Sequence, residues 1–152
     1  MEILRGSKEH VDACLSIGRE LDEYFNEQGI ATMTEDLRRH LLWVAVDSGE
    51  VKGFETIEHK NSQVAEISWL AVKLVHHRQG IGSALVDHAV TDLRPQGIKL
   101  LEVKTLAEDV DYPPYEKTRR FYQKMGFLHL ETIDPYPGWD PGNPCAIYAR
   151  IL

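Results

Sequence analysis

The sequence contains no apolar run near the roughly 20 residues that a membrane-spanning helix requires, and residues 1–5 read as the start of a strand rather than as a targeting segment. It has only two cysteines, Cys14 and Cys145, which are too few for a disulfide framework. Neither these cysteines nor the histidines have the spacing of metal ligands. We therefore expect a soluble cytoplasmic protein with two reduced core cysteines, no bound metal and no membrane partner.

An excess of basic charge is also absent. The chain has 17 lysines and arginines against 24 aspartates and glutamates, which gives a net charge of -7. Its basic residues are scattered along the sequence, and this argues against nucleic acid as the main partner, whereas a cationic substrate would suit the negative field. With 152 residues, 43% of them hydrophobic and 27% charged, residues 1–152 are expected to form a single globular domain.

What the sequence does contain is a glycine-rich turn between an apolar strand and an amphipathic helix, in the segment Val72–Leu85. Gly80 and Gly82 allow the backbone to approach a ligand, and the first N–H groups of the helix lack intrahelical partners, so the turn can attract an anion. Leu85 replaces the third glycine of a dinucleotide-binding fingerprint, and no Gly-Lys-Ser/Thr follows for a P-loop. The alternative is a turn that uses glycine for its geometry alone.

The order of predicted elements indicates a mixed α/β sheet with helices on both faces. Ser7 is expected to cap a helix over residues 8–25, and Thr32 with Glu35 forms a capping-box pattern for a shorter helix that ends near His40. A third helix follows the glycine turn and a fourth covers residues 115–125. Strands are predicted at residues 1–5, 41–46, 51–58, 64–72, 99–105, 127–133 and 145–151. The helical crossover between the strands at 64–72 and 99–105 implies that these two are parallel.

A second motif, Phe121-Tyr122-x-x-x-Gly126-Phe127, lies 40 residues beyond the glycine turn, which reads His77-x-x-Gly80-x-Gly82. Together the two motifs and the order of elements resemble the GNAT superfamily of acetyl-CoA-dependent N-acyltransferases. The resemblance extends over the whole chain. It implies a mostly antiparallel sheet of about seven strands, with a parallel pair that splays apart at the cofactor site.

The resemblance also implies a set of cofactor contacts. In this superfamily the glycine turn holds the pyrophosphate of acetyl-CoA, and the end of the preceding strand lines the pantetheine arm and offers N–H groups to the acetyl oxygen from a bulge. The residues of this chain at those places are Leu70, Ala71, Val72, His77, Arg78, Gln79, Gly80, Ile81, Gly82 and Ser83. His77 stands where the superfamily usually has Gln or Arg. Tyr115 stands where it often has an Asn that contacts the cofactor arm, and that contact is not carried over.

Tyr122 is the predicted general acid. By resemblance it lies beside the thioester sulfur, and a phenol with a pKa near 10 is still protonated at pH 7, so it can supply a proton to the leaving thiolate. The alternative is a purely structural role, because Tyr115, Thr118, Tyr122 and Met125 form a stripe at helical spacing.

Two carboxylates are candidates for the base that deprotonates the amine. Glu102 lies midway along the strand after the cofactor helix, and Glu66 near the start of the preceding strand is the second candidate; either could act through a water. The alternative for Glu102 is a structural ion pair with Lys104, two residues along the same strand face.

The predicted activity is transfer of the acetyl group from acetyl-CoA to a primary amine, of a small molecule or a peptide, in a ternary complex. Residues 134–144, rich in proline, glycine and aromatic side chains, could cover the acceptor, and with the acidic first helix would suit a cationic amine. The same loop could instead cap the core or meet a second copy of the chain in a homodimer. Two alternative functions stay open, a CoA-binding regulatory module that transfers no acetyl group and a binding protein without cofactor.

Overall fold

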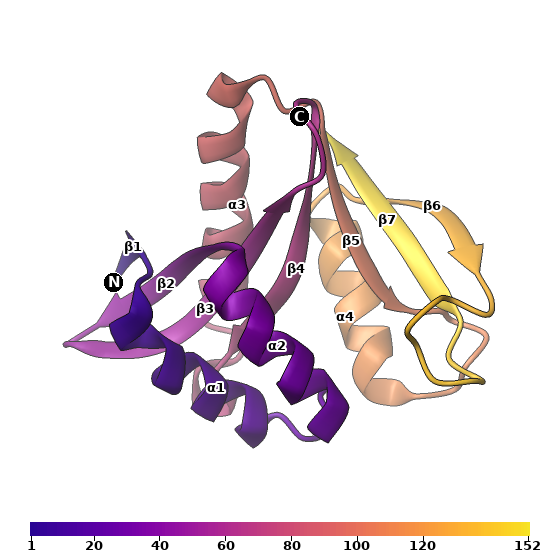
Figure 1. Cartoon of the computed structure of the whole chain (residues 1–152), viewed down its shortest axis with the longest axis horizontal. Coiled ribbons are helices and arrows are strands. Elements are labelled where there is room, and N and C mark those ends of the chain that lie inside the picture. Colours follow the sequence, from indigo (N-terminus) through magenta and orange to yellow (C-terminus); the bar gives the residue numbers. More distant parts are fainter.

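The computed structural model describes all residues, 1–152, as one seven-stranded sheet with four α-helices packed on it (Figure 1). The helices are α1 (Val11–Glu20), α2 (Glu27–Arg39), α3 (Ile81–Leu93) and α4 (Pro113–Lys124). The strands are β1 (Glu2–Arg5), β2 (Leu41–Asp47), β3 (Glu50–His59), β4 (Val64–Val72), β5 (Leu100–Leu106), β6 (Leu128–Ile133) and β7 (Cys145–Ile151). Their order across the sheet is β1-β2-β3-β4-β5-β7-β6, and every pair except β4–β5 is antiparallel.

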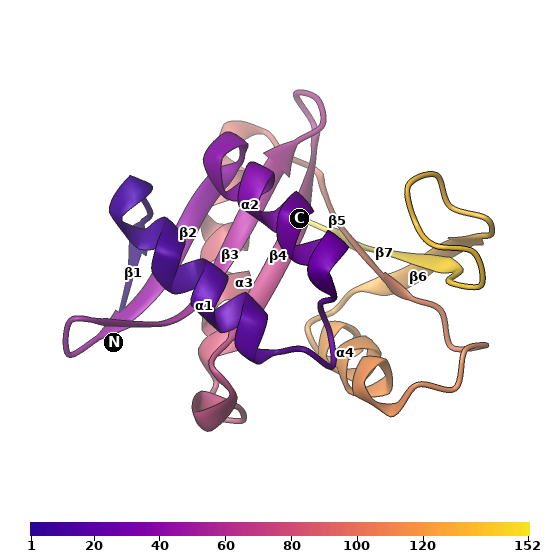
Figure 2. The ribbon, with the colours of Figure 1, turned by 60° about the horizontal axis from the view of Figure 1, so that its bottom comes forward.

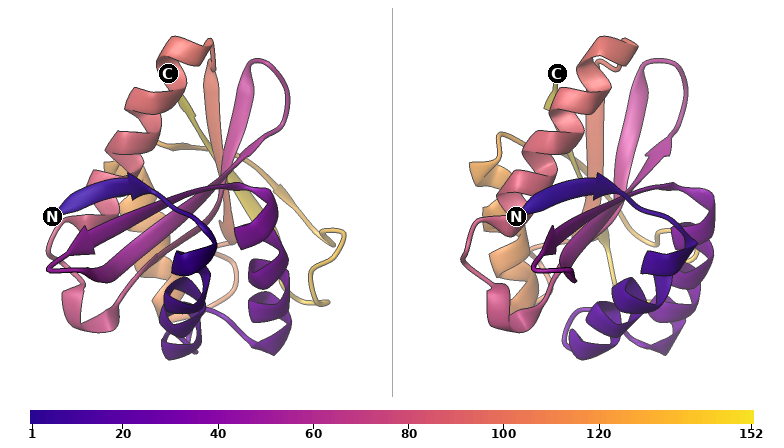
Figure 3. Two further views of the ribbon diagram at one scale, coloured as in Figure 1. Left: turned by 60° about the vertical axis from the view of Figure 1, so that its left-hand side comes forward. Right: turned by 90° about the vertical axis from the view of Figure 1, so that its left-hand side faces the viewer.

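The sheet lies between two helical layers, as predicted. Helices α1 and α2 cover one face and α3 and α4 cover the other (Figure 3). Each layer has its own apolar core: Phe54 and Met33 belong to the α1–α2 side, and Leu101 and Phe127 belong to the α3–α4 side. Both cysteines are buried and unpaired, as expected for core residues. None of the helices is both long and apolar enough to cross a membrane.

Strands β4 and β5 separate along their length. They pair only from Val64 to Glu66 on β4 and from Leu100 to Glu102 on β5. Beyond these residues the strands diverge, which opens the sheet toward its lower edge (Figures 1 and 2). One edge of β4 from residue 67 onward is therefore free of a sheet partner. The predicted splayed parallel pair is confirmed.

The strand boundaries agree with the sequence prediction within one or two residues, but two helices do not. The first predicted helix, residues 8–25, is shorter: a 3₁₀ turn at Lys8–His10 precedes α1, which ends at Glu20 because Leu21, with φ -90° and ψ 55°, leaves the helical conformation. The second helix begins earlier than predicted. Asn26 accepts a hydrogen bond from the Gly29 N–H at 2.8 Å and caps α2. Thr32 lies inside the helix, and its hydroxyl donates to the Gln28 carbonyl.

This correction can be tested by two matched substitutions. Asn26→Ala removes a side-chain acceptor from the helix N-terminus and should lower the free energy of unfolding by about 1 kcal/mol. Thr32→Ala removes only a bond within the helix and replaces a poor helix former with a good one, so it should be neutral or slightly stabilising. Urea unfolding of both variants measures the difference. If the larger loss came from Thr32→Ala, the helix start seen here would be wrong.

Candidate active site

The glycine turn presents a run of unused hydrogen-bond donors. The backbone N–H groups of residues 78–83 make no hydrogen bond within the protein; the first helical bond runs from the Ala84 N–H to the Gly80 carbonyl. Gly80 has a φ of 81° and Arg78 a φ of 63°, both in the left-handed region. Left-handed residues in such a turn are typical of backbone nests that bind anions, and the positive end of the α3 dipole adds to the attraction. The turn is therefore built to bind an anion such as a phosphate.

Gly82 joins the two sequence motifs in space. A Cβ atom built on Gly82 would lie 3.3 Å from Cζ of Phe121, on α4. A side chain at this position would crowd the Phe121 ring, so glycine favours the close packing of the start of α3 on α4. Gly80, by contrast, faces open space and is required for its φ angle. Glycine is thus favoured for different reasons at the two positions: for its backbone conformation at Gly80 and for a close contact at Gly82.

The other predicted cofactor residues line the same end of β4. Leu70, Ala71 and Val72 pair with β3 on one side, and their other side is the free edge beyond the β4–β5 pairing. The register shift in this strand pair lies opposite Thr56 and Ile57, at Ser68, so the predicted bulge is earlier than the strand end. From Trp69 to Val72 the pairing of β4 with β3 is regular, so the end of β4 carries no bulge.

His77, at the atypical position of the motif, makes a local contact. Its Nε2 lies 2.7 Å from the Val72 carbonyl oxygen, to which it can donate, and so the ring fastens the turn to the end of β4. The ring nitrogen engaged in this bond is not available to a cofactor phosphate. The neighbouring residues 77–80 are exposed.

Tyr122 is held by the end of its own helix. The Phe127 N–H donates to the Tyr122 carbonyl and the Gly126 N–H to the Gln123 carbonyl, with Gly126 at a φ of 88°. This is a Schellman cap, and its hydrophobic contact is the one between the Tyr122 and Phe127 rings, 5.3 Å apart. The motif Tyr-x-x-x-Gly-Phe therefore has a direct physical meaning. Tyr122 is 7% exposed, and its hydroxyl makes no hydrogen bond within the protein. Burial, and to a lesser extent the charge of Glu55, raises its pKa above the ordinary value, so the phenol stays protonated.

The two candidate bases meet where β4 and β5 begin to separate. Glu66 and Glu102 are register partners, and Lys104 lies between their side chains. The Lys104 ammonium is 2.9 Å from Glu66 and 3.3 Å from Glu102, and Lys60 adds a second contact to Glu66 at 3.0 Å. The ion pair of Glu102 with Lys104, the alternative to a base role, is present. Burial alone would lower the pKa of Lys104, but its bonds to Glu66 and the nearby negative charges raise it, so this lysine stays charged.

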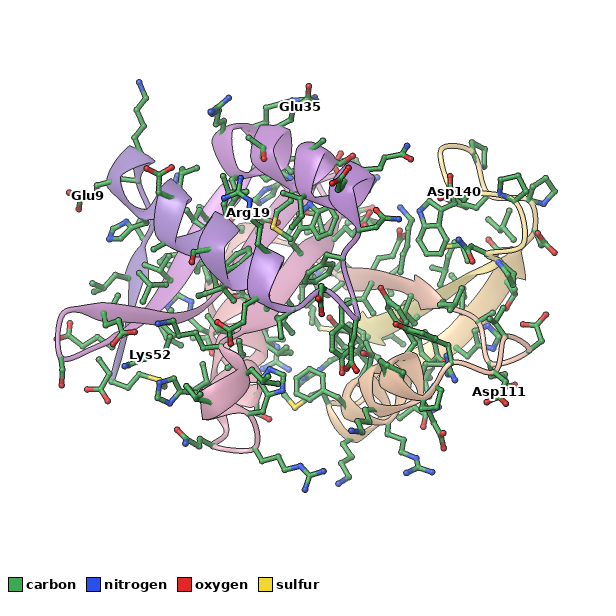
Figure 4. All side chains as sticks on the ribbon, turned by 90° about the horizontal axis from the view of Figure 1, so that it is seen from below. Glu9, Arg19, Glu35, Lys52, Asp111 and Asp140 are labelled. Atoms are coloured by element: carbon green, nitrogen blue, oxygen red, sulfur yellow. The ribbon has the colours of Figure 1, made fainter.

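One loop lies beside this cluster. In the loop of residues 134–144, the Tyr136 ring centroid is 5.5 Å from the Lys104 ammonium, so the loop lies against the sheet where Glu66 and Glu102 meet. The α1–α2 connection is tied to α4 by two tyrosine hydroxyls: Tyr112 donates to the Glu23 carbonyl and Tyr115 to the Tyr24 carbonyl. Seen from below, the loop that carries Asp140 lies to the right of the helices that carry Arg19 and Glu35 (Figure 4).

One buried titratable group in this region was missed by the sequence analysis. Glu55 is fully buried on β3, directly opposite Leu70, and neither of its carboxyl oxygens has a hydrogen-bond partner. The sequence does contain a sign of this group, because Glu55 is a charged residue at an inward-facing position of an apolar strand, between Gly53 and Ile57. Such a carboxyl normally has a partner or a function.

The described geometry can be compared with known proteins. A family model for the acetyltransferase (GNAT) domain matches residues 38–128, more than half of the chain, and this span includes both motifs. No curated protein sequence matches the chain.

Several solved structures share the fold. A protein of the GNAT family from Desulfovibrio desulfuricans is similar with a TM-score of 0.86 at 18% identity, over 99% of this chain and 98% of that chain. A ribosomal-protein alanine N-acetyltransferase from Escherichia coli has a TM-score of 0.79 at 20% identity, over 99% and 93%. A GNAT-family acetyltransferase from Elizabethkingia anophelis, with acetyl-CoA bound, has a TM-score of 0.74 at 18% identity, over 99% and 97%. With the family model matched across both motifs, the chain belongs to the GNAT family of acetyltransferases.

Proposed function

We propose that this protein transfers the acetyl group of acetyl-CoA to a primary amine by direct attack in a ternary complex. The observation that carries the proposal is the run of unpartnered N–H groups over residues 78–83, at the open end of the β4–β5 separation. These donors suit the cofactor pyrophosphate. From there the pantetheine arm would follow the free edge of β4 at Leu70, Ala71 and Val72 toward Tyr122. The protein supplies no covalent intermediate in this scheme.

The reaction requires two proton transfers. The neutral amine attacks the thioester carbon, and N–H donors along the free edge of β4 would stabilise the charge that develops on the acetyl oxygen. As the C–S bond breaks, Tyr122 gives its proton to the departing sulfur. The new amide nitrogen sheds one proton, which passes through a base and replaces the proton that Tyr122 gave. Because the pKa of Tyr122 is raised, the phenol does not ionise before the reaction. It can therefore give up its proton while the sulfur is gaining charge, as a general acid does.

Glu102 is the better candidate for the base. One oxygen of Glu66, Oε1, accepts a hydrogen bond from Lys104 and lies 3.0 Å from the Lys60 ammonium, and the side chain is only 9% exposed, so little water reaches it. Glu102 has a single contact, 3.3 Å from Lys104, and its side chain is 20% exposed, so a water can reach it. Glu66 would then hold Lys104 in place. The two lysines also balance the two carboxylates here, so attraction of a cationic amine would come from the acidic residues of the α1–α2 connection.

The cofactor proposal is tested most directly by melting. At 100 times its dissociation constant, acetyl-CoA should stabilise the protein by about 2.7 kcal/mol, which corresponds to a rise in Tm of roughly 5 to 11 °C for a chain of this size. S-acetylpantetheine lacks the phosphates, so it should give a much smaller shift at the same concentration. Equal Tm shifts from the two compounds would exclude residues 78–83 as the binding site for the cofactor phosphates. No shift from acetyl-CoA would favour a binding protein without cofactor.

The acceptor is tested by thiol release from acetyl-CoA with a panel of polyamines, amino sugars, amino acids and peptides. A productive amine should show release that depends on both substrates, with intersecting initial-rate lines typical of a ternary complex. Tight acetyl-CoA binding with no transfer to any amine of the panel would instead favour the CoA-binding regulatory module.

A further inference from the structure

A group of buried polar atoms without partners lies between β2, β3 and α3. Both carboxyl oxygens of Glu55, the indole nitrogen of Trp43 and Nδ1 of His88 are buried and make no hydrogen bond. Trp43 and Leu70 are the register partners of Glu55 on the two neighbouring strands. The Trp43 and His88 rings are 4.3 Å apart. Each buried polar atom without a partner lowers stability, so a cluster of them in a core calls for a functional reason.

This cluster adjoins the candidate general acid. Leu85 of α3 packs with Trp43 and Leu70, and so closes the core over Glu55, which lies between those two residues. Leu70 also packs against the apolar cluster that contains Tyr122. The Glu55 carboxyl, 0% exposed, and the Tyr122 phenol, 7% exposed, therefore lie in adjoining cores joined by Leu70, where charges interact more strongly than at the surface.

We propose that Glu55 is a positioning residue for acetyl transfer: it must be a neutral carboxylic acid for Tyr122 to release its proton. The proposal rests on the proposed function of Tyr122. When Tyr122 protonates the departing sulfur, a phenolate forms for a short time. A second negative charge on Glu55, in the adjoining core, would oppose that phenolate, whereas a neutral carboxyl would not. The proton on Glu55 is not consumed, and no step transfers it to substrate.

The surroundings of Glu55 favour its neutral form. Burial, followed by the charge of Asp92, raises the pKa of Glu55 well above the ordinary 4.5. The titratable groups around the cluster are His88 and Asp92 from α3 and Tyr122 from α4, while β2 and β4 contribute only Trp43 and Leu70. No cation is within salt-bridge distance of Glu55 to hold it ionised. The arrangement thus keeps a proton on Glu55 through the range in which most glutamates have lost theirs.

The test compares Glu55→Gln, which is neutral at every pH, with Glu55→Asp, which keeps the carboxyl. In the wild type and in Glu55→Asp, kcat should fall at alkaline pH as the carboxyl ionises. In Glu55→Gln, the fall should occur at a pH higher by roughly one unit or more, with kcat near neutral pH within about threefold of wild type and KM for acetyl-CoA unchanged. If Glu55 were purely structural, both variants would change the melting temperature, but the pH at which kcat falls would stay the same. A fall of kcat at the same pH in wild type and Glu55→Gln would overturn the proposal.

A second measurement does not depend on activity. NMR of ring-labelled tyrosine, assigned by the signal lost in Tyr122→Phe, follows the ionisation of Tyr122 directly. In Glu55→Gln the Tyr122 phenol should ionise at lower pH than in the wild type, because the opposing charge is gone. An unchanged Tyr122 titration refutes the coupling even if acetyl transfer and the role of Tyr122 stand. A shifted titration together with a fully active Tyr122→Phe variant refutes the proposed function of Tyr122 and with it the catalytic role of Glu55.

Discussion

Replacing Tyr122 with phenylalanine is expected to lower kcat by about 100-fold or more, the usual effect of removing a general acid. The leaving thiolate would then depart unprotonated. The ring itself stays, so the contact with Phe127 and the helix cap are kept, and the dissociation constant of acetyl-CoA should change little. Because the Tyr122 hydroxyl makes no hydrogen bond in the fold, its loss should not reduce stability. Initial rates of thiol release and acetyl-CoA titration measure the two quantities separately.

Tyr148→Phe is a matched control for this prediction. Tyr148 is 4% exposed and belongs to the same apolar cluster as Tyr122, but it lies on β7 and makes no contact with the glycine turn. The same substitution there should leave kcat within about twofold of wild type. A comparable loss of kcat in both variants would mean that the effect comes from the core rather than from the phenol. Undiminished activity of Tyr122→Phe would remove Tyr122 from the reaction.

The sequence was sufficient for the parts of this fold that depend on local patterns. Strands β2, β4 and β7 are recognisable from apolar runs bounded by turn residues, and the crossover through α3 fixes β4 and β5 as parallel. The motif around Gly126 was also readable, because a left-handed glycine followed by an aromatic residue ends a helix in a defined way. Both glycines of the turn were found, although only the structure separates the role of Gly82, which is contact with Phe121, from that of Gly80.

The parts that could not be predicted depend on partners distant in sequence. The sequence pattern at Thr32 and Glu35 placed the start of α2 too late, and only the path of the α1–α2 connection places Asn26 at the cap. The distribution of charge among Glu66, Glu102 and Lys104 follows from the register of β4 against β5, which no local pattern encodes. Glu55 lies within an ordinary strand sequence. Its burial is produced by α3, whose placement over β3 is a tertiary result.

Glu55 should also make the stability of the protein fall with rising pH. Burial raises the pKa of Glu55 in the folded state above the 4.5 of the unfolded chain. Below pH 4.5 both states hold the proton and the residue has no pH effect. Between the two pKa values the unfolded state has released the proton and the folded state has kept it, so the free energy of unfolding falls by about 1.4 kcal/mol for each pH unit. Above the folded-state pKa the loss is complete and constant.

Glu55→Gln should remove this slope, because glutamine does not ionise in either state. The free energy of unfolding, measured in urea at several values between pH 5 and pH 8, should decline less steeply for Glu55→Gln than for the wild type, with the variant relatively more stable at the upper end. Glu131→Gln, at an exposed position on β6, should keep the wild-type slope. Parallel curves for wild type and Glu55→Gln would show that Glu55 is ionised when folded. Leu or Met would fill the same space without this loss of stability near neutral pH. The presence of a carboxyl at position 55 therefore points to a function linked to Tyr122.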